Sequence, residues 1–186
     1  MLAGIGFAKV TARLLDDLTL LTVGPQLRGG LNNTIGQRAV KQAFELIRHH
    51  VVHAIVAESA RRLELVNASG RHVFIQLASD PDITITERIS ADTERNLVAI
   101  EVKGGQDASN AWNRLGEAEK SHQSAKLRDF REFWTIVNVD RLDREKAREK
   151  SPTTNRFFQL RTICAAGSAA HADFRSQLVS VVGITA

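Results

Sequence analysis

Two stretches of the chain read Ser79-Asp80-Pro81-Asp82-Ile83-Thr84-Ile85 and Leu97-Val98-Ala99-Ile100-Glu101-Val102-Lys103-Gly104-Gly105. Their Val and Ile content predicts two strands, and a polar, turn-rich segment between them predicts a hairpin. Side chains alternate between the faces of a strand, so Glu101 and Lys103 share one face while Ile100 and Val102 face a core. The hairpin is expected to bring Asp82 close to Glu101.

Two carboxylates at one place repel each other and lose hydration unless a cation lies between them. Hard oxygen ligands suit Mg²⁺, which keeps several waters and accepts phosphate oxygens from a substrate. Lys103 would help to hold an attacking water and offset the charge of a phosphate. Lys103 is the only one of the seven lysines with an acidic residue two places before it, and Pro81-Asp82 is the only Pro-Asp pair. The alternative is a half-exposed strand with ordinary surface charges.

The pattern of Asp82, Glu101 and Lys103 resembles the PD-(D/E)xK nuclease superfamily. The longer run from Glu101 to Asn110, together with Arg114 to His122, resembles type II restriction endonucleases, XcyI-like enzymes in particular, over residues 70 to 184. The resemblance implies a restriction-endonuclease-like α/β fold, with a central mixed β-sheet flanked by helices. It implies Mg²⁺ as cofactor, double-stranded DNA as substrate, a homodimer, and a DNA methyltransferase in the same system.

Composition fits this interpretation without deciding it. The 186 residues, 43% of them hydrophobic, predict one nuclease domain over 1–186 with a real core. Within it we expect a helical part over 1–66, a catalytic sheet over 67–140 and C-terminal helices over 141–186. A net charge of +4 fits a polyanionic partner. Cys164 is the only cysteine, which predicts a reducing cytoplasm, and charged residues in the apolar N-terminal stretch exclude a membrane span.

The expected elements begin with a helix over 7–22, ended by Gly24-Pro25, and a loop at Gly29-Gly30 and Asn32-Asn33. A long helix or two stacked helices follow over 34–65. The remaining expected elements are a strand at 72–77, the two motif strands, a helix capped by Asp107 or Ser109 and reaching Leu127, a strand at 133–139, a charged helix at 141–150, and two short helices split near Gly167.

The helix after Gly104-Gly105 carries a second candidate site. Helical spacing predicts that five residues of this helix face the core: Trp112, Leu115, Ala118, His122 and Ala125. The candidate DNA-binding residues are Asn110, Asn113, Arg114, Glu117 and Ser121. Arginine reads guanine, and glutamate accepts from cytosine amino groups in the major groove. The alternative is a solvated polar face, which most helices have.

Weaker candidates lie on the early helix. Glu45 and Glu58 are possible additional acids near the metal, since many enzymes of this superfamily take one from an early helix. His49 and His53 have a spacing that metals use, but surface or core histidines are the simpler interpretation.

The function predicted from the motif and the resemblance is a Mg²⁺-dependent endonuclease specific for a DNA sequence. The alternatives are a repair or recombination nuclease such as a junction resolvase, and a non-catalytic nucleic-acid-binding module.

Overall fold

Helix α1 is longer than the sequence predicts. The computed structural model describes residues 11–105 and 110–185, and the chain divides into two compact units, 1–35 and 36–186. Helix α1 spans Ala12–Val51, so the expected helix end at Gly24-Pro25 and the expected loop at 29–33 are wrong. Glycine and proline lower helix propensity by about 1 and 3 kcal/mol without forbidding the helix, and long helices on both sides can outweigh that cost.

The expected helix over 34–65 is wrong beyond Val51. A short 3₁₀ turn, η3 (Val52–Ala54), leads into the antiparallel strands β1 (Ile55–Ser59) and β2 (Arg62–Val66). The helical part expected over 1–66 therefore contains a β-hairpin. In β2, buried Leu63 and Leu65 alternate with Arg62 and Glu64, which is a period of two. Five strand residues are too few for that period to stand out beside the helical pattern that precedes them.

The sheet is mixed, as the predicted fold class requires. Its seven strands lie in sequence order from β1 to β7. Strands β1 to β5 form an antiparallel meander, and β6 and β7 add in parallel to β5. The remaining strands are β3 (His72–Leu77), β4 (Ile83–Ser90), β5 (Thr93–Lys103), β6 (Glu132–Val137) and β7 (Arg156–Gln159). Strand β7 is absent from the expected elements, because four residues carry too little periodicity to predict a strand.

The predicted helices after the sheet core are confirmed with shifted ends. They are α2 (Ala111–Lys126), α3 (Arg144–Lys150), α4 (Leu160–Cys164) and α5 (Ala169–Val182). Asn110 precedes α2, while the expected caps Asp107 and Ser109 lie outside the described residues. None of the helices in the described residues combines the length and apolarity that crossing a bilayer requires.

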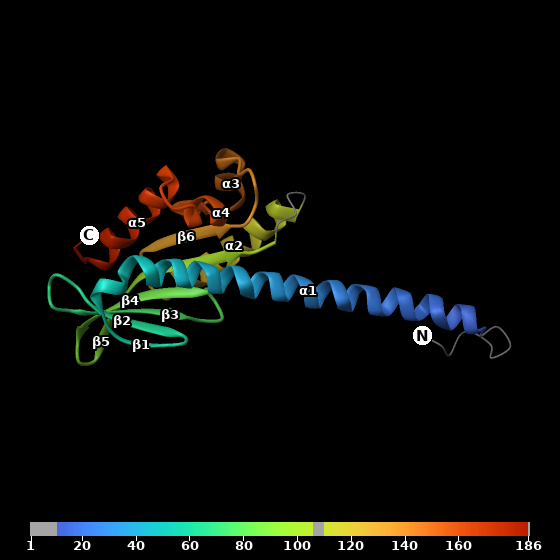
Figure 1. The fold of residues 1–186 in the computed structure, drawn as a ribbon, viewed down its shortest axis with the longest axis horizontal. Coiled ribbons are helices and arrows are strands. Elements are labelled where there is room, and N and C mark those ends of the chain that lie inside the picture. Colours follow the sequence, from blue (N-terminus) through green and yellow to red (C-terminus); the bar gives the residue numbers. More distant parts are fainter. Residues whose placement is uncertain (1–10, 106–109, 186) are drawn as a thin grey trace. The chain divides into compact units, whose positions relative to one another are not determined.

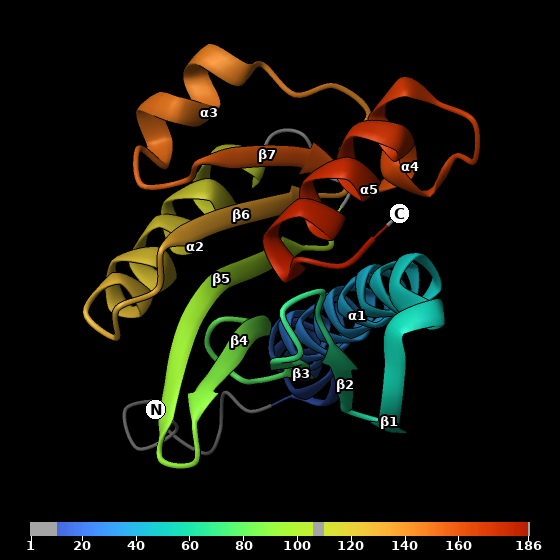
Figure 2. The same cartoon turned by 90° about the vertical axis from the view of Figure 1, so that its left-hand side faces the viewer.

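The helices cover the two faces of the sheet unequally. On one face, the last part of α1 and helix α5 pack on the strands through Phe44, Ile47, Phe174 and Leu178 (Figures 1 and 2). On the other face, α2 packs on β5 and β6 (Figure 2). A small apolar cluster there consists of Ala99, Ala125, Phe130 and Phe133. Helix α2 is thereby held beside the end of β5, where the motif residues lie.

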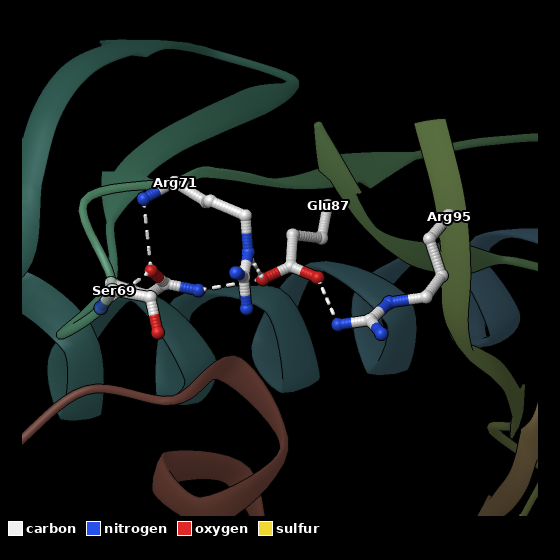
Figure 3. Close-up of polar contacts among 5 residues, drawn as sticks. Ser69, Arg71, Glu87 and Arg95 are labelled. Atoms are coloured by element: carbon white, nitrogen blue, oxygen red, sulfur yellow. Dashed lines mark hydrogen bonds and ion pairs between the residues drawn. The ribbon is translucent and has the colours of Figure 1, made fainter. Parts of the chain in front are cut away.

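A buried carboxylate, Glu87, holds together the part of the motif hairpin that lies toward its turn (Figure 3). Glu87 of β4 is 2% exposed and accepts hydrogen bonds from Asn67 Nδ2 and Arg71 Nε, both at 2.7 Å, and from Arg95 Nη2. Burial alone would raise the pKa of Glu87, but these hydrogen bonds outweigh it and hold the pKa below its ordinary value. The network joins the β2–β3 turn to β4 and β5.

Candidate active site

The hairpin of β4 and β5 brings the predicted motif together. Asp82 lies directly before β4, and the pairing of Ile83 with Ile100 sets it opposite the end of β5. The backbone N–H of Val102 donates to Asp82 Oδ2 at 2.8 Å. Strand alternation places Glu101 and Lys103 on one face, where Lys103 Nζ lies 2.7 Å from Glu101 Oε2. The expected proximity of Asp82, Glu101 and Lys103 is confirmed.

These side chains line an open cavity of about 410 Å³. Its walls come from the start of β4, the end of β5 and one face of α2. The lining residues are Ser79, Asp80, Asp82, Glu101, Lys103, Glu117, Lys120 and Ser121. The cavity is therefore lined by polar side chains of both charges. At about 30 Å³ for each water, its volume admits a phosphate group and several waters.

The two motif carboxylates are in unequal environments. Glu101 is 4% exposed and is paired with Lys103. Burial and, after it, the charge of Glu101 raise the pKa of Asp82 to about 6, although the Val102 N–H and Lys103 act in the opposite direction. Among the described residues, the Asp82 carboxylate thus has no ion pair of its own, while the charge of the neighbouring carboxylate of Glu101 acts on it more strongly than that of Lys103.

This donor set fits a hard divalent cation. The described residues contain no group of three or more His, Cys, Asp or Glu side chains arranged to hold a metal ion. Mg²⁺ does not require one, since it is commonly bound by one or two carboxylates and completes its shell with waters and substrate phosphates. A cation between Asp82 and Glu101 would also relieve the repulsion that raises the pKa of Asp82.

Ser121 and Asp80 extend the site beyond the predicted motif. The Ser121 hydroxyl lies 2.6 Å from Glu101 Oε1 and also within hydrogen-bonding distance of Asp80 Oδ1. Arg128 Nη2 donates to the Asp80 carbonyl oxygen at 2.8 Å. Ser121 is 9% exposed, so it lies inside the site rather than on an open polar face. Sequence reasoning missed Asp80 and Lys120, and only the position of Asp80 beside Pro81-Asp82 pointed to it.

The predicted faces of α2 are largely confirmed. Leu115, Ala118, His122 and Ala125 are fully buried, and Trp112 is partly buried against Leu115 and its neighbours. His122 forms a 2.9 Å hydrogen bond with Thr135 Oγ1. The side of α2 that carries Glu117, Lys120 and Ser121 faces the cavity. The polar stripe therefore begins in the active site and continues toward the start of the helix.

The first turns of α2 carry the remaining candidate DNA-binding residues. Asn110 and Asn113 are exposed and share a hydrogen bond of 2.9 Å from Asn113 Nδ2 to Asn110 Oδ1. The Arg114 guanidinium occupies the space where a side chain at Gly105 would stand. Glycine at 105 therefore lets Arg114 lie directly beside the end of β5.

The weaker candidates lie away from this cavity. Glu45 is exposed on α1 and does not line the cavity, and Glu58 pairs with Arg48 at 2.8 Å. His53 contacts the carbonyl oxygen of Thr185 at 2.9 Å, and His49 is exposed. The structure does not bring any of these residues to Asp82 and Glu101.

A mixed sheet whose antiparallel hairpin presents an Asp and a Glu-x-Lys pair defines a restriction-endonuclease-like fold. The chain belongs to the XcyI restriction endonuclease family, whose model matches residues 1–185. That match also covers the first seventy residues, over which the sequence alone had indicated no family.

Two curated relatives match the chain over 186 residues. The chain is 49% identical to the type II restriction enzyme Cfr9I of Citrobacter freundii and 50% identical to the type II restriction enzyme XcyI of Xanthomonas campestris pv. cyanopsidis. Each match covers 100% of this chain and 56% of the relative, so the chain spans just over half of their length. No solved structure matches the chain.

Proposed function

We propose that this chain carries the catalytic site of a Mg²⁺-dependent, sequence-specific endonuclease that hydrolyses double-stranded DNA as a type II restriction enzyme. The observation that carries the proposal is the cavity in which Asp82, Glu101 and Lys103 converge at the end of one hairpin. The names of the two relatives support the same reaction class.

In the proposed mechanism, Asp82 and Glu101 would hold the metal ion. When bound there, Mg²⁺ supplies Lewis-acid polarisation of the phosphate and lowers the pKa of a coordinated water. The Val102 N–H keeps Asp82 in place, and Ser121 keeps Glu101 in place. Lys103 donates to the attacking water and offsets negative charge on the phosphate.

DNA recognition is assigned to the polar stripe of α2. The start of α2, which follows the catalytic strand in the chain, carries Asn110, Asn113, Arg114 and Glu117. If this part of the helix entered the major groove, it would fix the distance between these side chains and the phosphodiester bond that is cut. Ser121 contributes by holding Glu101 rather than by reading a base, because its hydroxyl already lies between Asp80 and Glu101. Arg114 is the principal candidate for guanine recognition.

The partners proposed are a second copy of the chain and a DNA methyltransferase of the same system, with the enzyme acting in the cytoplasm. A homodimer is proposed because a palindromic site mirrors two-fold symmetry and two strands require two active sites.

The test is cleavage of a mixed plasmid substrate with and without Mg²⁺. We expect discrete bands in Mg²⁺ and no cutting in a chelator. Cleavage confined to junctions or ends would identify a repair or recombination nuclease instead. DNA binding without nicking of any substrate would identify a non-catalytic binding module.

A further inference from the structure

A groove lined by arginines runs along the free edge of β7, away from the active site. β7 is the last strand in the sheet order, so one of its edges has no strand partner. One cavity of about 140 Å³ is lined by Arg144 and Arg148 of α3, Arg156 of β7 and Asp173 of α5. An adjoining cavity of about 150 Å³ shares Arg144, Phe157, Phe158 and Asp173 with it.

The fold directs these arginines to one place. Arg144 and Arg148 are four residues apart on α3 and therefore share one face of the helix. Ala147 is fully buried against Phe157 and Val137, which holds α3 beside β7. Arg156 begins β7 and stands beside Phe157, so the strand and the helix bring three guanidinium groups to the same groove.

These arginines are poorly neutralised by the protein. Within the residues that the structure describes, Arg144 and Arg148 have no ion pair, and Arg156 Nε is buried without a hydrogen-bond partner. Its nearest acid is Glu132 at 3.7 Å, whose carboxylate already accepts from Trp134 Nε1 at 2.9 Å. By contrast, Lys146 on the same helix pairs with Asp143 at 3.6 Å. Three arginines against the carboxylates of Asp173 and Glu132 leave the groove with an excess of positive charge.

We propose that this groove binds a backbone phosphate of the DNA, at a position separate from the scissile phosphate. Planar guanidinium forks match phosphate oxygens, and the buried Arg156 Nε, which lacks a hydrogen-bond partner, favours a ligand rich in acceptors. A cavity of about 140 Å³ holds a phosphate group but not a base pair. β7 is two strands from β5, so it lies about 10 Å across the sheet from the catalytic strand, and the groove lies beyond it. The inference rests on the proposed function for its choice of ligand.

The test measures DNA affinity across a salt series for the purified chain carrying Arg144→Ala, Arg148→Ala or both. Ca²⁺ replaces Mg²⁺ so that no cutting occurs. Each lost phosphate contact should lower the slope of log K against log salt by about 0.9, equally for cognate and random duplexes. The double variant should lose affinity about tenfold or more at low salt. Both arginines are exposed, and circular dichroism checks that the variants fold as the wild type does.

Arg141→Ala and Lys150→Ala are the matched controls, because both residues are exposed on the same segment and do not line the groove. Their salt slopes should equal that of the wild type. An unchanged slope in the double variant would overturn the proposal, as would a fall equally large in the controls. Inorganic phosphate bound with an unchanged DNA slope would also overturn it, and would identify a free-phosphate site. Cleavage by the wild type in Mg²⁺ tests the nuclease function separately, so the two failures are distinguishable.

Discussion

Strand β4 has a paired end, toward which Glu87 is buried, and an unpaired end, where Asp82 is partly buried directly before the strand; the two carboxylates are in opposite electrostatic situations. At one end, Glu87 accepts from Arg71, Arg95 and Asn67, and its pKa lies below the ordinary value. At the other end, burial and the neighbouring Glu101 raise the pKa of Asp82 to about 6. A carboxylate that the protein neutralises contributes to the fold, whereas one left beside a second carboxylate costs stability and indicates a function.

The largest effect should come from the unpaired end. Asp82→Asn or Glu101→Gln should reduce DNA cleavage at least about a thousand-fold, equivalent to about 4 kcal/mol of transition-state stabilisation. DNA binding should be retained, because these residues would hold the metal rather than the bases. Single-turnover cleavage and a binding assay in Ca²⁺ measure the two properties separately.

Stability should respond to Asp82→Asn in the direction opposite to activity, since the substitution removes one of two like charges from a buried site. Unfolding by urea should give a free energy equal to or higher than that of the wild type. Normal cleavage rates in both variants would remove Asp82 and Glu101 from the active site.

The paired end should show the reverse pattern. Glu87→Gln should lower the free energy of unfolding by about 2 kcal/mol, because two arginines lose a buried partner while remaining able to reach water. Cleavage per folded molecule should stay near the wild-type rate. Urea unfolding and single-turnover cleavage supply the two readouts, and a loss of activity without a loss of stability would mean that Glu87 belongs to the catalytic machinery.

The stability difference between wild type and Glu87→Gln should depend on pH in one direction. The pKa of Glu87 is lowered on folding, so its contribution is fully present above the unfolded value of 4.5 and is lost as pH falls through the folded value. Burial lowers the pKa of His50 and His122 to about 4, so both histidines bind protons more readily in the unfolded state. Acid therefore destabilises the wild type and Glu87→Gln equally through these histidines. Unfolding free energies from pH 7 to 3 should therefore converge only below about pH 4.5, and convergence at higher pH would contradict the assignment.

A smaller effect is expected from Arg114, whose guanidinium lies beside Gly105, just after the end of β5. Arg114→Ala should weaken cognate binding by about tenfold, or about 1.4 kcal/mol, and leave random duplexes nearly unchanged, because a guanine contact acts only on the specific sequence. Asn113→Ala is the neighbouring control on an exposed position of the same helix. Equal losses on cognate and random duplexes would make Arg114 a phosphate contact.

The sequence predicts the unpaired end well and the paired end not at all. The site at Asp82 and Glu101 follows from strand alternation and one hairpin, which are local properties. The Glu87 network joins residues from a turn and two strands, and their register is not evident from the sequence. Likewise, Ser121 reaches Glu101 only because α2 packs on β5 and β6, so the pattern of its helix alone predicted a DNA-binding candidate on the polar stripe.

The central claim, that Asp82 and Glu101 form a cation site, is tested most directly by thermal unfolding across a Mg²⁺ series. A ligand that binds only the folded state raises the unfolding free energy by about 1.4 kcal/mol at a free concentration ten times its dissociation constant. The account predicts a Mg²⁺-dependent rise in Tm for the wild type and for Glu87→Gln, and none for Asp82→Asn. No rise in the wild type, or an equal rise in Asp82→Asn, would contradict it.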